Sequence, residues 1–280
     1  LPLKHPVNLA YEAATADLND VNMIDPFHLE AYGETTVNYN RDVEIFPVLN
    51  TIFEKIYGES PYKSPTDMGV NMAGNCICDD EACREASKQE IIRRYYSALN
   101  SLVKGDSSDK EAQKIELLMN MAGISVEDRK VAVKALARAR ETNGPAAALE
   151  LEDGRIITGK TTNLLGASAA LLLNVLKELA GIDHSLHIIS PQSIEPIQKL
   201  KVDYLKSKNP RLHTDEVLIA LSASAADSQE ARLALSQLPK LEGCQAHTSV
   251  MLSDVDIKIF KKLGVQLTCE AVYEHSYLSH

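Results

Sequence analysis

The sequence is short of basic residues and contains no long apolar run. Lysine and arginine number 29 against 39 aspartates and glutamates, which gives a net charge of −10. Binding to a nucleic-acid backbone requires a basic face, so we expect no nucleic-acid partner. An apolar run of membrane-spanning length and a secretory signal pattern are both lacking, so we also expect no membrane partner.

The five cysteines form no disulfide framework, because their number is odd and their spacing is irregular. Such usage is typical of a reducing compartment, and we expect a cytoplasmic location. The 280 residues are enough for two or three domains with cores of their own. The chain begins at Leu1 instead of methionine, which indicates a fragment, a processed product or a shortened form.

One stretch, Gly154–Thr161, fits the phosphate-loop pattern G-x-x-x-x-G-K-[ST]. A working phosphate loop has a bare backbone between its glycines, with amides that point at phosphate oxygens. Here residues 146–151 and 155–158 each favour a strand, and an Asp-Gly pair favours a turn between them. The pattern therefore predicts a β-hairpin whose amides pair within a sheet. A small anion at residues 158–163, a polar loop at the start of the next helix, stays open.

Residues 145–280 alternate between strand and helix patterns. An apolar helix is expected over 164–179, and it must be buried because apolar residues surround it. The remaining expected elements are a strand at 186–190, helical elements between 196 and 237, a strand at 247–252, a helix at 254–263 and a strand at 265–273. This order indicates an α/β domain with helices over a mixed sheet. In element order alone, a hairpin, a helix and parallel crossovers resemble the cytidine-deaminase-like fold.

The amino-terminal half is expected to be mainly helical. Periodic apolar residues predict helices over 43–57, 80–103 and 109–122, and a capping box at Ser125–Asp128 opens another. Gly144-Pro145 ends that helix and marks a boundary. The expected fold is therefore α/β plus α, with an irregular and helical segment at 1–78, a helical domain at 79–143 and an α/β domain at 144–280.

A zinc site is not expected. His28-Leu29-Glu30 matches the H-x-E half of the zinc deaminase signature, whose chemistry also needs P-C-x-x-C to hold the metal. The cysteines that come nearest, Cys76, Cys78 and Cys83, have the wrong spacing. Zinc requires a complete ligand set, so the half-motif predicts no metal.

Two irregular stretches, residues 20–42 and 59–75, carry the candidate site. Irregular segments of this length in compact domains are often functional, although polar turn residues also have local backbone roles. Roles as acid, base or Mg²⁺ ligand are assigned to Asp25, His28, Asp42 and Asp67. Substrate-binding roles are assigned to Asn38, Asn40, Arg41, Asn71, Lys88 and Arg94. Alternatively, Asp42 pairs with Arg41 or caps the next helix, and Lys88 and Arg94 lie on a solvated helix face.

Several long motifs resemble those of one bacterial family. They are HPVNLAYEAATADL, NMIDPFHLEAYG, VNYNRDVEIFPVLN, SPTDMGVNMAG and ASKQEIIRRYY. Over its whole length the chain resembles this uncharacterised family of unknown function. The resemblance implies that the chain is the carboxyl-terminal part of a longer protein. Its amino-terminal part would resemble an α/β nucleotide-binding domain with its own phosphate loop. The resemblance implies no catalytic residues.

Two classes of function are compatible with these features. In the first, the chain is the substrate-binding part of a nucleotide-dependent enzyme that catalyses a phosphoryl or ligase-type transfer. Its cofactor is a nucleotide with Mg²⁺, its ligand is a small molecule or nucleotide, and its partner is the missing amino-terminal domain. In the second, the chain is a non-catalytic binding or assembly module, in which the apolar helix and the helical segment supply packing and subunit contacts. We expect a homo-oligomer.

Overall fold

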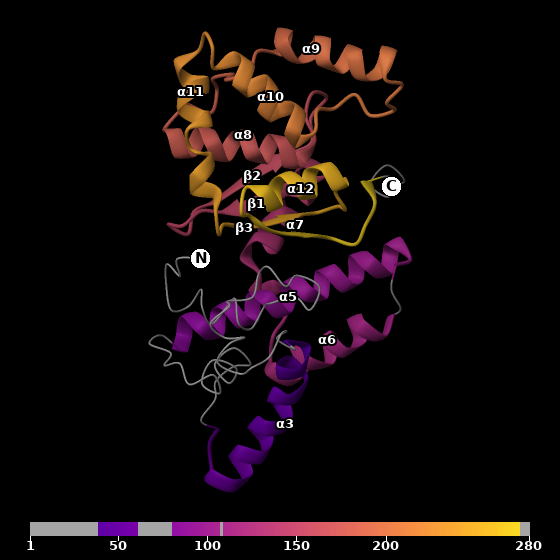
Figure 1. The fold of residues 1–280 in the computed structure, drawn as a ribbon, viewed down its shortest axis with the longest axis vertical. Coiled ribbons are helices and arrows are strands. Elements are labelled where there is room, and N and C mark those ends of the chain that lie inside the picture. The colour runs from indigo at the N-terminus through magenta and orange to yellow at the C-terminus, as the bar shows by residue number, and fades with distance from the viewer. Residues whose placement is uncertain (1–38, 61–79, 107–108, 275–280) are drawn as a thin grey trace, which may run out of the picture. The chain divides into compact units, whose positions relative to one another are not determined.

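The computed structural model describes residues 39–60, 80–106 and 109–274 of the chain (Figure 1). The chain forms two compact units. Residues up to Ala98 together with Ser108–Asp128 form the first, and Leu99–Ser107 together with the residues from Arg129 onward form the second. The three-part division at residues 78 and 143 remains a proposal.

The described part of the first unit is helical. It contains α3 (Tyr39–Tyr57), most of α5 (Asp80–Lys104), α6 (Asp109–Ala122) and the 3-10 turn η2 (Val126–Asp128). The ranges predicted for α5 and α6 are confirmed. The capping-box prediction is only partly right, because Ser125 N donates to Asp128 Oδ2 at 2.8 Å across the 3-10 turn. The following helix, α7 (Lys130–Thr142), begins after that turn.

Helix α3 differs from its prediction in two ways. It begins at Tyr39 instead of Val43, because polar residues such as aspartate are favourable in a first turn, where the helix dipole is positive. The expected core face is also wrong in its carboxyl-terminal half, since Ile52 and Ile56 are 43% and 64% exposed. Spacing showed that these residues share a face, but it did not show what covers that face.

In the described part of the second unit, four strands form one mixed sheet in the order β2-β1-β3-β4. The strands are β1 (Ala146–Glu150), β2 (Ile156–Lys160), β3 (Gln245–Thr248) and β4 (Gln266–Cys269). Strand β1 is antiparallel to both β2 and β3, whereas β3 and β4 are parallel. The mixed α/β sheet is thus confirmed. Among the described strands, β3 and β4 form the parallel pair. The likeness to the cytidine-deaminase-like fold remains a prediction from element order.

The predicted hairpin is confirmed, and it replaces the phosphate loop. Ala147 of β1 pairs with Gly159 of β2, so the second glycine of the pattern lies in a strand. Gly154 lies in the turn with φ +81°. A Cβ on Gly159 would lie 2.2 Å from the backbone nitrogen of Leu171, so this glycine permits α8 (Ala167–Ala180) to pack closely on β2.

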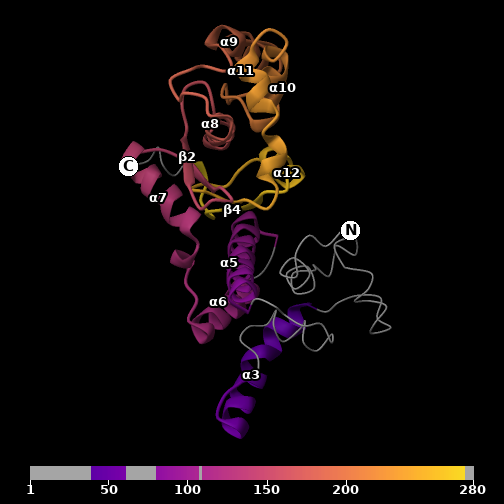
Figure 2. The same ribbon diagram turned by 90° about the vertical axis from the view of Figure 1, so that its left-hand side faces the viewer.

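The two faces of the sheet are covered by different helices (Figure 2). Helix α7 contacts β1, β2 and β3 on one face, and α8 contacts β1 and β2 on the other. Behind α8 lie α10 (Thr214–Ser224) and α11 (Gln229–Leu235), and α12 (Asp254–Lys262) contacts β4. The remaining elements are α9 (Pro191–Lys199), the π-helical turn η3 (Leu200–Tyr204) and the 3-10 turn η4 (Leu238–Leu241). The buried apolar residues of α8 form the centre of the core, as its sequence predicts.

The strand predicted at 186–190 is wrong, because no strand is assigned to these described residues. Ile188 and Ile189 are buried, so the apolar run reflects burial of a loop. The amine of Lys177 on α8 donates to the carbonyl oxygen of Leu186 at 2.9 Å. Burial lowers the pKa of this amine. The amine of Lys177, and not a neighbouring strand, therefore supplies the hydrogen bonds that the loop carbonyls need.

We expect Gly159→Ala to lower the free energy of unfolding by about 2–3 kcal/mol, because the new methyl group would overlap the backbone of α8. Gly154→Ala is the control. Its Cβ would meet nothing within 4 Å, and the positive φ alone costs about 1–2 kcal/mol. Urea denaturation followed by circular dichroism measures both. A loss for Gly159→Ala no larger than for the control would contradict the close packing.

Candidate functional site

The parallel pair β3–β4 and its connecting helix α12 form a β-α-β unit. In open α/β sheets, ligands bind beyond the carboxyl ends of parallel strands, near the amino terminus of the connecting helix. The strands stay paired at that end, where Glu270 N donates to the carbonyl oxygen of Thr248 at 2.9 Å and Met251 N to that of Val272 at 2.8 Å. A ligand of this unit is therefore expected at the carboxyl edge of β3 and β4.

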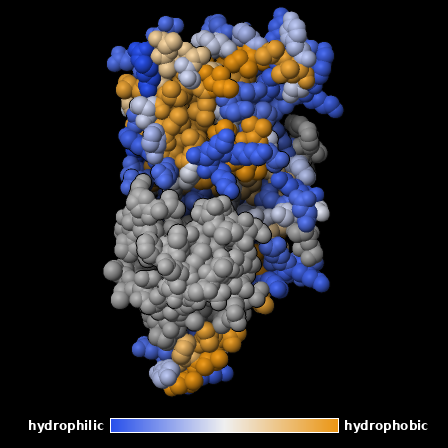
Figure 3. All heavy atoms as spheres, in the orientation of Figure 1, coloured by the Kyte–Doolittle hydropathy of each residue, from blue (hydrophilic) through white to orange (hydrophobic). Residues whose placement is uncertain are grey.

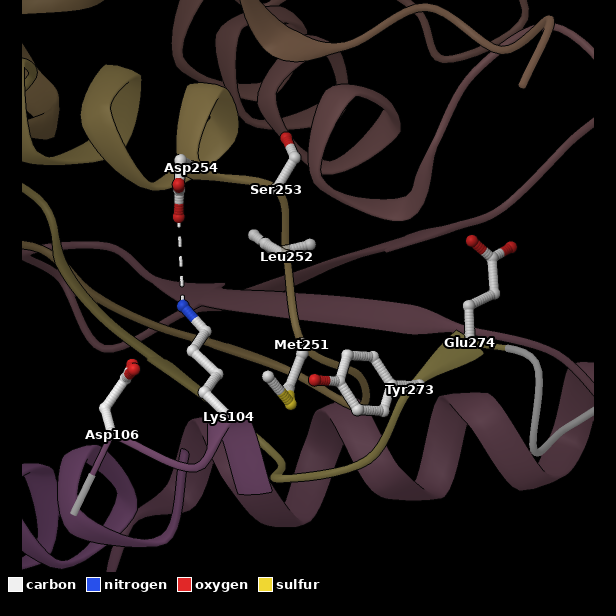
Figure 4. Close-up of a pocket in the computed structure, with 8 residues that line it drawn as sticks. All are labelled: Lys104, Asp106, Met251, Leu252, Ser253, Asp254, Tyr273 and Glu274. Carbon is white, nitrogen blue, oxygen red and sulfur yellow. Dashed lines mark ion pairs between the residues drawn. The ribbon is translucent and has the colours of Figure 1, made fainter. Parts of the chain in front are cut away.

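A cavity of about 600 Å³ lies at this edge (Figure 4). Its lining comes from the end of α5, from the loop between β3 and α12, and from the segment after β4. The described lining residues are Lys104, Asp106, Met251, Leu252, Ser253, Asp254, Tyr273 and Glu274. All of them belong to the second unit.

The described lining combines one cation with three carboxylates and an apolar part. The amine of Lys104 points at the carboxylate of Asp254, with 3.8 Å between Nζ and Oδ1 (Figure 4). Asp254 is 79% exposed, so this ion pair is weak and a ligand can compete for the amine. Asp106 and Glu274 supply the other carboxylates, and Glu274 pairs with Arg211. Such a cavity can bind a ligand with a charged end and an apolar body.

The end of α5 is fixed to the open edge of β4. The side-chain amide of Asn100 donates to the carbonyl oxygen of Cys269 at 2.8 Å. That carbonyl belongs to an edge strand, whose outward backbone groups need partners. The bond holds the last turn of α5, and with it Lys104, beside the carboxyl end of β4.

A buried carboxylate organises the elements behind the cavity. Asp256 Oδ1 accepts hydrogen bonds from Thr214 N at 2.9 Å and Thr214 Oγ1 at 2.8 Å, at the start of α10. Its Oδ2 accepts from Ser253 Oγ at 2.8 Å and lies 3.0 Å from His213 Nδ1. Burial opposes ionisation, but these hydrogen bonds outweigh it and lower the pKa of Asp256 to about 2. One carboxylate therefore joins the amino termini of α10 and α12.

Ser253, His213 and Asp256 have the composition of a hydrolase triad but not its geometry. In a triad, the histidine receives the serine proton on one ring nitrogen and donates to the carboxylate from the other. Here the serine hydroxyl and the carboxylate both lie near His213 Nδ1, at 3.5 and 3.0 Å. The serine proton points at a carboxylate whose pKa is about 2, which is a poor base at neutral pH. The cluster is structural, with Ser253 as the N-cap of α12.

The sequence-predicted site residues are only partly described by the structure. Asp25, His28, Asn38, Asp67 and Asn71 lie outside the described residues. The prediction that Asn40, Arg41 and Asp42 lie in an irregular loop is wrong, because all three are in the first turns of α3. A shared site formed by these residues therefore remains a prediction.

The two basic residues predicted on α5 have carboxylate partners on their own helix. Lys88 Nζ lies 3.1 Å from Glu85, and Arg94 Nε lies 3.0 Å from Glu90. Arg93, between them on the same helix, is buried and also pairs with Glu90. Neither Lys88 nor Arg94 is among the described residues that line the cavity.

Sequence reasoning missed the residues that do line the cavity. Lys104, Asp254 and Tyr273 are far apart along the chain and belong to no motif, so no spacing connects them. The one available signal was the expected order of strand, helix and strand at 247–273, whose carboxyl edge is the usual ligand position.

Among the described residues, no group of three or more His, Cys, Asp or Glu side chains could hold a metal ion. Mg²⁺ does not need such a group, since it is usually held by one or two carboxylates and substrate phosphates. No helix among the described residues is long and apolar enough to cross a membrane.

Comparison with known proteins shows one family over nearly the whole chain. Residues 127–278 match the model described as domain of unknown function DUF1846, C-terminal, and residues 1–123 match its N-terminal counterpart. The chain is 61% identical over 273 residues to a UPF0371 protein of Corynebacterium urealyticum, which covers 98% of this chain and 55% of that protein. It is 56% identical over 278 residues to one of Streptococcus thermophilus, covering 99% of this chain and 56% of that protein.

These matches correct the expected place of the chain within its family. The chain spans about half the length of the curated relatives it matches. It is nevertheless more than the family's carboxyl-terminal domain, because residues 1–123 match the N-terminal model.

We expect the stability of the second unit to depend on pH through Asp256. Its pKa falls from 3.8 to about 2 on folding, so its contribution is present above pH 3.8 and is lost as the pH falls towards 2. That shift corresponds to about 2 kcal/mol at neutral pH. Asp256→Asn should therefore be less stable than the wild type by about 2–3 kcal/mol at pH 7, with a smaller difference at pH 3.

Denaturant titrations of both proteins between pH 3 and pH 8 measure this difference. Asp254→Asn, an exposed change on the same helix, is the control and should stay within about 0.5 kcal/mol of the wild type. The hydrogen bond to Asp256 raises the pKa of His213, so the contribution of His213 should be complete in acid and decline as the pH rises above 6.5. A pH-independent effect of Asp256→Asn would show that its charge is not what stabilises the helices.

Proposed function

We propose that this chain, which belongs to the DUF1846 family of unknown function, binds a phosphate-bearing small molecule at the carboxyl edge of β3 and β4. In this proposal it is the substrate-binding part of a nucleotide-dependent enzyme. The observation that carries the proposal is the cavity at the first turn of α12. Its volume of about 600 Å³ is within the usual range for small-molecule sites, about 300–1,000 Å³.

The position of the cavity favours a phosphate. The first turn of a helix presents backbone N–H groups and the positive end of the helix dipole, and Lys104 adds a full positive charge beside Asp254. The loop from Ser249 to Ser253 contains no glycine, so its backbone cannot wrap a phosphate as a glycine-rich loop does. Charge from Lys104 therefore has to supply much of the attraction.

The three described carboxylates that line the cavity make Mg²⁺ part of the proposal. Asp106, Asp254 and Glu274 would repel a phosphate that entered alone. A Mg²⁺ ion removes this repulsion, because it binds one or two carboxylates together with phosphate oxygens. The proposed cofactor is accordingly Mg²⁺, which enters with the phosphate and needs no complete ligand set from the protein.

The phosphate loop of the proposed enzyme has to lie elsewhere in the protein. The match at Gly154–Thr161 is a hairpin packed on α8. We place the loop in the part of the relatives' length that this chain does not span. The acid and base roles of Asp25, His28, Asp42 and Asp67, and the substrate contacts of Asn38, Asn40, Arg41 and Asn71, stay a separate proposal for the first unit.

We expect Lys104→Ala to weaken Mg²⁺-dependent binding of a phosphate compound about tenfold or more, because a hydrogen bond to a charged group contributes about 1.5–3 kcal/mol. Native mass spectrometry of the full chain with nucleoside mono-, di- and triphosphates and sugar phosphates, with and without Mg²⁺, identifies the compound. Isothermal calorimetry then measures its affinity. Lys130→Ala, which removes an exposed lysine near Glu150, is the matched control. Binding that neither Mg²⁺ nor Lys104→Ala alters would contradict the proposal.

A second candidate function, assembly of copies of this chain, is favoured by one observation. Helix α3 exposes an apolar stripe at helical spacing, Val48, Ile52 and Ile56, which are 58%, 43% and 64% exposed, and Figure 3 shows apolar surface over this helix. The sequence analysis expected the apolar helix α8 to supply subunit contacts, but α8 is buried within the core. The exposed stripe on α3 is therefore the candidate subunit contact.

Under this candidate, Ile52→Asp should convert an oligomer into a monomer, since a charge in an apolar interface loses its hydration without gaining a partner. Light scattering after gel filtration measures the mass. Thr51→Asp, at the adjacent exposed position, is the control. A wild-type chain that is monomeric at all concentrations tested would remove this candidate.

A further inference from the structure

The ion pair between Lys104 and Asp254 lies on the wall of the cavity, and neither of its side chains is buried (Figure 4). Lys104 Nζ lies 3.8 Å from Asp254 Oδ1, and the two side chains are 38% and 79% exposed. An ion pair at this distance and exposure stabilises a protein very little. Two opposite charges that line the same cavity can therefore be separated by a ligand that binds one of them.

The backbone on both sides of this pair is held by hydrogen bonds in which the pair takes no part. On the side of Lys104, the side-chain amide of Asn100 donates to a backbone carbonyl oxygen of β4 at 2.8 Å. On the side of Asp254, Ser253 Oγ accepts from Asp256 N at 3.3 Å and donates to Asp256 Oδ2 at 2.8 Å. The two charged side chains can therefore separate while the end of α5 and the start of α12 keep their positions.

The other two described carboxylates of the lining are placed differently from Asp254. Glu274 already has a cationic partner in Arg211, and Figure 4 shows its carboxylate apart from the ion pair. Asp106 follows Lys104 by two positions in the same segment of the chain, whereas Asp254 approaches the amine from the start of α12. Asp254 is therefore the carboxylate that a phosphate has to displace in order to reach the amine.

A phosphate that binds Lys104 leaves the carboxylate of Asp254 without its cation. The phosphate and the carboxylate are then two anions on either side of one amine, and they repel each other. Mg²⁺ removes the repulsion, because it is usually held by one or two carboxylates together with substrate phosphates. Asp254 is 79% exposed, so its carboxylate can turn towards such an ion with little loss of packing.

We propose that Asp254 changes its partner when a phosphate compound binds. The amine of Lys104 passes from Asp254 to the phosphate, and Asp254 becomes the protein ligand of the Mg²⁺ that enters with the phosphate. This inference rests on the proposed function and assigns the position of the metal within the same site. In the empty site Asp254 competes with a metal-free phosphate for the amine, and in the filled site it binds the metal, so the pair selects the magnesium complex of the ligand.

The experiment measures calorimetric affinities of the full chain for ADP, inorganic pyrophosphate and glucose 6-phosphate, without Mg²⁺ and with Mg²⁺ in excess. We expect Mg²⁺ to raise the affinity of the wild type about tenfold. Asp254→Asn should bind the metal-free compound about threefold to tenfold more tightly than the wild type, because the amine has lost its competitor, and should lose the stimulation by Mg²⁺. Asp106→Asn, which removes the same charge from the same lining, is the matched comparison and should keep most of the stimulation.

A double-mutant cycle tests whether Asp254 acts through Lys104. Without Mg²⁺, the gain in affinity from Asp254→Asn should disappear in the Lys104→Ala background, because that variant has no amine to release. An equal gain in both backgrounds would show that Asp254 only repels the phosphate, and it would overturn the exchange of partners.

A second cation tests whether Asp254 binds the metal directly. The hexamminecobalt(III) ion is positively charged but keeps its six ammonia ligands, so a carboxylate cannot replace one of them. We expect this ion to raise the affinity of the wild type much less than Mg²⁺ does. A wild type that responds equally to both cations would overturn the assignment of Asp254 as a metal ligand.

The outcomes separate this inference from the proposed function. If Lys104→Ala weakens binding but Asp254→Asn keeps the full stimulation by Mg²⁺, the exchange is overturned while the phosphate site stands. If Asp106→Asn loses the stimulation and Asp254→Asn keeps it, the assigned position of the metal is wrong. If none of the three compounds binds, the exchange falls, and the proposed function falls with it only when the wider panel of phosphate compounds also fails to bind.

Discussion

The guanidinium of Arg129 holds the start of α7 against the parallel strands. It donates to Thr268 Oγ1 and Gln245 Oε1, each at 2.8 Å, and to the carbonyl oxygens of Ala246 and Gln266 at 2.9 and 2.8 Å. A charge buried this completely is tolerated only where its donors find acceptors. Because those acceptors come from both β3 and β4, one side chain fixes the register of the pair and the position of the helix that covers the adjoining strands.

A buried carboxylate and a contact at the sheet edge stabilise the carboxyl ends of the same two strands. Asp256 joins the amino termini of α10 and α12, and Asn100 holds the end of α5 on the open edge of β4. Helix starts and strand ends both carry unsatisfied backbone groups, and here polar side chains satisfy them at the carboxyl edge. The cavity, Lys104 and Asp254 therefore occur where several chain segments already converge for structural reasons.

Local features of the sequence predicted much of the fold. The β-branched run and the Asp-Gly turn predicted the hairpin β1–β2, and the apolar helix predicted the buried core helix α8. The run Leu186–Ser190 misled because burial and strand formation favour the same residues. On α3, the spacing of Ile52 and Ile56 indicated a shared face, but exposure depends on a neighbour that the spacing does not describe.

The sequence by itself determined the acidic balance, the alternation of elements in the second half, and the failure of Gly154–Thr161 as a phosphate loop. Each follows from the charges, turns and periodicity of adjacent residues. Only the tertiary structure decided that Lys104 lies near Asp254, and that Thr268 accepts a hydrogen bond from Arg129. Those contacts join residues more than twenty positions apart, because sheet register and helix packing bring them together and no local pattern encodes that pairing.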